Sequence, residues 1–205
     1  LGFVSLLYGG ILAWRQQDLK AMVAYSSISH MGVVLIGIAT LNVSGMTGAV
    51  MQMVAHGLTA ATLFLIVGLL YQRTHSRDLA DYGSLLGRAP HFAFFIAFAL
   101  LAAIGLPGSA GFIAELHVLI GGFGRWGSWV LIVCLGMLIG AAYGLRVIGR
   151  LCGKGEAMTI DDMTRTEIWA ATILALSIVT LGVWPAPLLA LVAGSVARIA
   201  ALFGA

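Results

Sequence analysis

Six long apolar runs, separated by short charged segments, constrain this chain more than any other feature of its sequence. They cover approximately residues 1–14, 21–41, 46–72, 91–123, 127–149 and 167–184. A helix needs about 20 predominantly apolar residues to cross the hydrocarbon core of a membrane, and only 9% of the residues are charged. The pattern therefore predicts an all-α, polytopic membrane protein with about six transmembrane helices and excludes a soluble globular domain. The net charge of +3 is small and gives no indication of nucleic-acid binding.

The runs form a single expected transmembrane domain, residues 1–184, followed by a C-terminal segment. Residues 185–205 are apolar but carry Arg198, so they are expected to lie along the membrane interface; the alternative is the beginning of another span. The chain starts at Leu1 inside an apolar run, without an initiator methionine or polar leader. We therefore expect it to be a piece of a longer protein.

The basic residues give the expected orientation in the membrane. When the runs alternate direction, nine of the eleven basic residues fall on the side that holds the 15–20, 73–90 and 150–166 loops. Only Arg125 and Arg198 fall on the other side. Lysine and arginine are enriched in cytoplasmic loops, so the first side is expected to be cytoplasmic.

The fourth run is too long for one upright span. Its roughly 33 residues would form about 50 Å of helix, against about 30 Å of hydrocarbon. The segment Leu106–Gly111 contains Pro107, Gly108 and Gly111 and predicts a break between two half-helices. A simple proline kink in a tilted helix is the alternative.

Three titratable groups are expected near the middle of the bilayer on three consecutive runs. Counted from the run ends at 1.5 Å per residue, His30 lies about 14 Å deep, His56 about 15 Å and Glu115 about 12 Å. Glu115 follows the break and is expected in the first turn of the second half-helix. Ionisable side chains within a membrane are functional candidates, and imidazoles can pass protons near neutral pH, so the three residues indicate a proton path.

Several polar neighbours are expected to support this path. Gln52 and Thr59 share a helix face with His56, and Ser26 lies one turn before His30. Lys20, at the inner end of the second run, is a further proton-path candidate. Structural alternatives remain: His30 could serve only as an interhelical hydrogen-bond donor, and Lys20 could simply extend to the membrane surface or pair with Asp18.

The two cysteines give no sign of a disulfide or a metal site. Cys134 and Cys152 are separated by about 27 Å if the intervening residues are helical, beyond disulfide reach. No spacing typical of metal ligands is present. We therefore expect no catalytic residue, metal or bound cofactor in this chain.

Several sequence strings together resemble one known family. They are QDLK (17–20), AYSSISHMG (24–32), GAVMQMVAHGL (48–58), LYQRTH (70–75), GLPG (105–108), GFIAE (111–115) and LGVWP (181–185). The chain resembles the antiporter-like membrane subunits of NADH:quinone oxidoreductase (respiratory complex I), most of all the chain M (subunit 4) type. The resemblance covers essentially the whole chain.

The resemblance implies more than the residues alone. Family members have about fourteen helices in two inverted five-helix repeats, each with a broken helix; this chain resembles the C-terminal half and its second repeat. Glu115 matches the family's proton site on the broken helix, and His56 matches the histidine of the preceding helix. The glutamate and channel lysines of the first repeat have no counterpart here.

The expected function is proton translocation coupled to electron transfer in other subunits, in a complex that uses NADH and quinone. The expected partners are other membrane subunits and the lipid bilayer, and the expected location is the bacterial inner membrane. Two alternatives stay open. One is a subunit of a sodium/proton antiporter or of a membrane-bound hydrogenase, and the other is a purely structural fragment.

Overall fold

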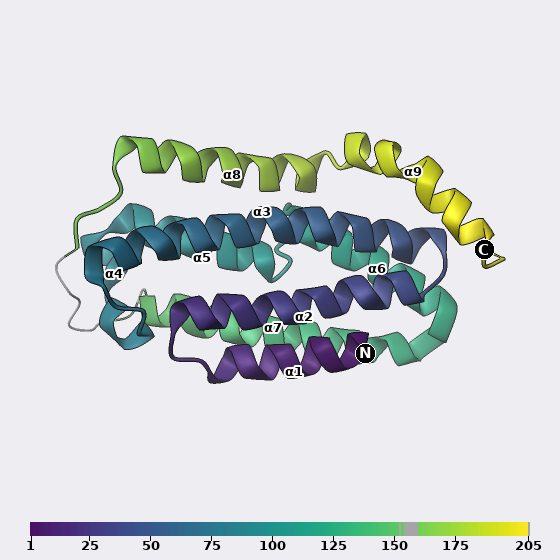
Figure 1. The fold of residues 1–205 in the computed structure, drawn as a ribbon, viewed down its shortest axis with the longest axis horizontal. Helices are drawn as coiled ribbons and strands as arrows, with labels where there is room; N and C mark the ends of the chain where they lie inside the picture. The colour runs from purple at the N-terminus through teal and green to yellow at the C-terminus, as the bar shows by residue number, and fades with distance from the viewer. Residues whose placement is uncertain (152, 154–159, 205) are drawn as a thin grey trace.

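The computed structural model describes residues 1–151, 153 and 160–204, and most of these are helical. Figure 1 shows the long helices side by side along the long axis of the molecule. They are α1 (Gly2–Arg15), α2 (Leu19–Ala39), α3 (Val43–Thr74), α7 (Leu131–Leu151) and α8 (Arg165–Val183). With the half-helices described next, this arrangement confirms an all-α membrane fold of about six crossings.

The fourth crossing is a broken helix. Its two halves, α5 (Pro90–Ala103) and α6 (Ala110–Trp126), follow one another along the long axis with a loop between them (Figure 1). Pro107 has no backbone N–H to continue a helix, and Gly105 and Gly108 adopt φ angles of 83° and 94°. These left-handed conformations end the helix, so a simple kink is excluded.

The break lies at residues 104–109, slightly earlier than the sequence indicated. Gly111, expected within the break, is instead the second residue of α6. Glu115, expected in the first turn of the half-helix, is its sixth residue and lies in the second turn. The difference arises because Ser109 already has the extended conformation of an N-cap residue (φ −95°, ψ 155°), so the helix begins directly after it.

Four stretches of helix are long and apolar enough to cross a membrane: α2, α3, the run Ala110–Leu151 and α8. The third of these comprises α6, the short 3₁₀ turn η2 (Gly127–Val130) and α7, and Figure 1 shows that α7 runs back along the bundle. It therefore counts as a hairpin of two crossings. The shorter α1 and α5 lie within the same bundle (Figure 1).

One end of the bundle is tied together by loops. The segment before α2 pairs with the segment before the 3₁₀ turn η1 (Leu79–Tyr82) through two backbone hydrogen bonds, from Leu19 N to Arg77 O (2.8 Å) and from Leu79 N to Gln17 O (2.9 Å). The single turn α4 (Leu85–Arg88) follows. At this end Tyr82 is 1% exposed and packs in the main hydrophobic core.

The C-terminal segment forms helix α9 (Ala186–Ala201), which packs on the start of α3. Met46 of α3 and Val196 and Ala200 of α9 form a small buried apolar cluster. Cys134 is a free, partly buried cysteine on α7, whereas Cys152 lies outside the described residues.

Candidate functional site

The structure brings His30 of α2 and His56 of α3 together. Their ring centroids are 5.1 Å apart, with the rings inclined by 35°. A cavity of about 10 Å³ lies beside both rings and is also lined by Gln52, Thr59 and Gly111. This volume is close to the smallest that holds one water molecule. Residues from four helices, α2, α3, α5 and α6, therefore line one small cavity.

His30 has a polar environment that its protein neighbours do not satisfy. Its Nδ1 lies 3.4 Å from Nε2 of Gln52. Among the described residues, His30 Nε2 and Gln52 Oε1 are buried without a hydrogen-bond partner. Because buried polar atoms are normally paired with protein or with ordered water, each of these two atoms has unused hydrogen-bonding capacity beside a cavity that its side chain lines.

Glu115 is a nearly buried carboxylic acid, 9% exposed. It belongs to the face of α6 that packs towards α3 and α2. A second cavity of about 10 Å³ is lined by Glu115, His30, Ser29 and Tyr143. His30 lines this cavity as well as the first one. The imidazole of His30 therefore lies between the cavity that reaches Glu115 and the cavity that reaches His56.

Glu115 also faces a larger space on its other side. A cavity of about 370 Å³ between α6 and α7 is lined by Glu115, Phe112, Leu116, Met137 and Leu138, among other residues. Most of these lining side chains are apolar. The Glu115 side chain thus lines both the small internal cavity that it shares with His30 and the larger, mostly apolar cavity between α6 and α7.

The expected supporting residues occupy different positions. Gln52 and Thr59 line the cavity beside His56, and the Thr59 hydroxyl donates to its own helix at Ala55 O (3.0 Å) and His56 O (3.1 Å). Ser26 is buried and donates to Val23 O (2.7 Å), outside both small cavities. Lys20 is exposed at the start of α2, about 15 Å along the helix from His30, and lines a different cavity with Arg77.

Sequence reasoning missed three residues of the site. Tyr143, on α7, is 4% exposed and lines the cavity between Glu115 and His30. The Ser29 hydroxyl beside it donates to Leu6 O across to α1 (2.8 Å). Gly105 leaves room for the carboxylate, because a Cβ at this position would lie 2.5 Å from Glu115 Oε2. A buried tyrosine in an apolar run and a glycine before proline were the available signals.

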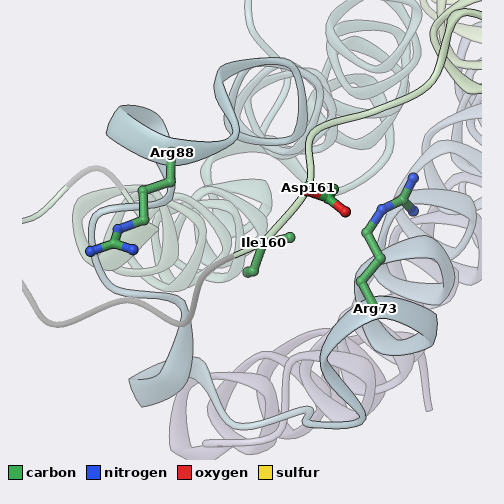
Figure 2. A pocket seen from close by; sticks show the side chains of 4 residues that line it. All are labelled: Arg73, Arg88, Ile160 and Asp161. Carbon is green, nitrogen blue, oxygen red and sulfur yellow. The ribbon is translucent and has the colours of Figure 1, made fainter.

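A separate polar cavity of about 610 Å³ lies at the loop end of the bundle and is lined by Arg73, Arg88, Ile160 and Asp161 (Figure 2). Figure 2 shows that the Arg88 guanidinium points away from Arg73. Arg73 is already paired with Glu167 (2.7 Å). This cavity therefore presents no convergent set of free charges. Within the described part of the chain, no three histidine, cysteine, aspartate or glutamate side chains are grouped as metal ligands.

Comparisons with known proteins agree with this geometry. Residues 1–141 match a family described as NADH:quinone oxidoreductase/Mrp antiporter, transmembrane. The chain is 39% identical over 204 residues to NADH-quinone oxidoreductase subunit M of Rhodobacter capsulatus. The alignment covers 97% of this chain and 40% of that protein. The chain thus spans about two fifths of the length of this relative.

Solved structures show the same fold. A chain of respiratory complex I from Thermus thermophilus with bound NADH superimposes with a TM-score of 0.88 at 29% identity, over 98% of this chain and 44% of that chain. A chain of the Mrp complex from Dietzia sp. superimposes with a TM-score of 0.87 at 18% identity, over 97% and 46% respectively. The second likeness shows the shared fold alone.

Proposed function

Because the chain belongs to the NADH:quinone oxidoreductase/Mrp antiporter transmembrane family, we propose that it is a proton-translocating part of a membrane subunit of NADH:quinone oxidoreductase. Among the superimposed structures, its identity to the complex I chain, 29%, is higher than its identity to the Mrp chain, 18%. This difference favours the oxidoreductase over a sodium/proton antiporter. The comparison gives no support to the alternative that the chain is a purely structural fragment.

One observation carries the proposal: Glu115, His30 and His56 are linked by two cavities that share His30. A proton leaves the Glu115 carboxylic acid through a water molecule in the second cavity and reaches the imidazole of His30. The His30 imidazole then passes a proton towards His56, whose ring centroid lies 5.1 Å away, because an imidazole can take up and release protons near neutral pH. The charge moves in the plane of the membrane, from α6 to α3.

The buried groups have properties that suit such a path. A carboxylate buried without hydrogen bonds is costly, and so is an unpaired imidazole nitrogen. Both costs fall when a proton or a water molecule is present. A change of charge in a neighbouring subunit would therefore shift the proton between Glu115 and the histidines.

The chemistry that drives this movement lies elsewhere in the proposed complex. NADH is oxidised and quinone is reduced by other subunits, and this chain binds neither. Its proposed partners are the neighbouring membrane subunits and the lipid bilayer, and its proposed location is the bacterial inner membrane. A membrane-bound hydrogenase that uses the same module is the remaining alternative, distinguished by which electron donor supports pumping.

The test is proton flux in vesicles that contain the complete, full-length complex. Glu115→Gln keeps the volume and polarity of the side chain but removes its proton, so we expect pumping to fall several-fold with normal assembly. Glu115→Asp should retain part of the flux. Asp161→Asn removes an exposed carboxylate outside the cluster and serves as the matched control. Full-rate pumping by Glu115→Gln would refute the proposal.

A further inference from the structure

A fourth cavity, of about 230 Å³, lies between the start of α2 and the end of α3. It is lined by Lys20, Phe64, Val67, Gly68, Tyr71 and Arg77. The start of α2 and the end of α3 lie at the loop end of the bundle (Figure 1). The cavity therefore opens at the membrane surface on the side that carries most of the basic residues.

The fold brings the two cations of this cavity to one rim. Leu19, next to Lys20, donates its N–H to the carbonyl of Arg77 (2.8 Å), so the two residues belong to paired backbone segments. The Arg77 guanidinium carbon lies 4.5 Å from the centroid of the Tyr71 ring. This contact places the exposed arginine against Tyr71 on the cavity wall.

The nearest carboxylates are engaged in helix capping. Asp18 accepts a hydrogen bond from Ala21 N (2.8 Å), and Asp78 accepts one from Ala80 N (2.9 Å). Neither aspartate lines the cavity, and its described lining contains no carboxylate. Among the described residues, no ion pair involves Lys20 or Arg77. The rim therefore presents two positive charges to a ligand.

The inner part of the cavity is apolar. Phe64 lies two helical turns, about 10 Å, deeper along α3 than Tyr71, and Val67 and Gly68 lie between them. A Cβ at Gly68 would have no heavy atom within 4 Å, so the helix surface has a gap at this position. The cavity is thus cationic at the membrane surface and apolar towards the membrane centre.

We propose that this cavity binds an anionic phospholipid, with its phosphate at Lys20 and Arg77 and one acyl chain over Gly68. Basic pockets between helices on the cytoplasmic side bind anionic head groups. A zwitterionic lipid brings its own cation to the rim, whereas phosphatidylglycerol brings one negative charge and no cation. The site lies outside the proton cluster, and it assigns Lys20 a lipid contact in place of a step in the proton path.

The charge test uses the full-length protein in its assembled complex. Detergent-purified complex is placed in nanodiscs of mixed phosphatidylglycerol and phosphatidylcholine, re-extracted, and its retained lipids are measured by mass spectrometry. Lys20→Gln combined with Arg77→Gln should lower the preference for phosphatidylglycerol at the most tightly held site by about tenfold. Arg88→Gln combined with Arg165→Gln removes two exposed charges elsewhere and should leave it unchanged. The proposal is overturned if the Lys20/Arg77 double variant keeps its preference for phosphatidylglycerol, or if both double variants lose it equally.

The shape test leaves both charges in place. Gly68→Leu fills the gap in the cavity and should release the retained phosphatidylglycerol, whereas Gly57→Leu, which also has no atom within 4 Å of its added Cβ but lies outside the cavity, should not. Inorganic phosphate is added to the nanodiscs as a competitor. If it displaces the retained phosphatidylglycerol completely, only the head group binds. A photoreactive residue at position 68 should cross-link to lipid; cross-linking to a polypeptide would identify a neighbouring subunit and overturn the proposal. If Gly68→Leu does not assemble, the charge variants decide.

Discussion

At the scale of single residues, unsatisfied polar atoms are the informative feature of this chain. His30 Nε2 and Gln52 Oε1 are buried without partners among the described residues, and each orphaned group costs about 1–3 kcal/mol. Replacing such groups by apolar ones could remove this cost. Their presence beside cavities large enough for one water each supports a path in which protons move through changing hydrogen bonds.

The histidine at the far end of the path gives a prediction of its own. In the complete complex, His56→Ala should slow proton pumping several-fold, because it removes the acceptor whose ring lies 5.1 Å from that of His30. His117→Ala is the matched control, since the His117 ring bonds its own helix at Ile113 O (2.8 Å) and lines neither small cavity. Proton flux and the amount of assembled complex should be measured together. Equal flux in the two variants would leave His56 as a packing residue.

A pair of glycines separates backbone strain from the position of Glu115. Gly105→Ala and Gly108→Ala both place a side chain at a left-handed residue, at a cost of roughly 1–2 kcal/mol. Only at Gly105 would the new Cβ meet Glu115 Oε2; at Gly108 nothing lies within 4 Å. We expect similar losses of thermal stability but a larger loss of pumping for Gly105→Ala. Equal pumping in both variants would show that the carboxylate tolerates displacement.

Helical spacing predicted part of the site and could not predict the rest. Gln52, His56 and Thr59 share a face because they recur at intervals of three and four residues, and the structure places all three on one cavity. Tyr143 could not be found this way. Spacing assigns residues to a face of their own helix, whereas the position of Tyr143 on the cavity that Glu115 lines depends on how α7 packs against the broken helix.

At the scale of elements, the broken helix shows what local sequence determines. Pro107 and two left-handed glycines require an interruption, and the sequence located it to within two or three residues. The end of α5 is gradual. The N–H groups of Ile104 and Gly105 still bond to Leu100 O and Ala102 O, so the chain turns gradually out of the helix before the proline.

The start of α5 is held by a carboxylate from a distant loop. Asp162 accepts hydrogen bonds from His91 N (3.2 Å), Phe92 N (3.3 Å) and the His91 ring (2.6 Å). Partial burial alone would raise the pKa of Asp162, but these bonds outweigh it and hold the pKa below its usual value. The folded protein therefore stabilises the ionised form of Asp162 relative to the unfolded chain, in which these hydrogen bonds are absent.

This clamp gives a prediction for stability and pH. Asp162→Ala should lower the free energy of unfolding by about 1 kcal/mol at neutral pH, as the loss of other helix caps does. A lowered pKa stabilises the fold fully above the unfolded pKa of about 3.9, and the effect is lost as pH falls through the folded value. The difference in melting temperature between the two proteins should therefore shrink below about pH 4. Asp161→Ala, which removes the neighbouring exposed carboxylate, should show no such loss; a difference that is constant with pH would exclude the clamp.

At the scale of the whole molecule, the chain is polarised along its long axis. The loop after α3 and the start of α8 lie at one end of the bundle, with the α1–α2 loop (Figure 1). The turns α2–α3 and α6–α7 lie at the other end (Figure 1). The described parts of the basic loops predicted to share one side of the membrane thus lie at the same end of the bundle. The sequence could predict this alternation because charge and span length act independently of how the helices pack.

The final prediction tests that orientation directly. Ala80 lies in η1 at the basic end, and Arg125 lies near the end of α6 at the opposite end; both are exposed. In a background with Cys134→Ser and Cys152→Ser, Ala80→Cys should react with a membrane-impermeant maleimide only from the cytoplasmic side, and Arg125→Cys only from the outside. The reason is that lysine and arginine in short loops fix orientation during insertion. Intact cells and inverted vesicles supply the two sides, and permeabilised membranes confirm that both cysteines are reactive. If both positions were labelled from the same side, the chain between them would not cross the membrane once. That result would contradict a fourth crossing built from α5 and α6.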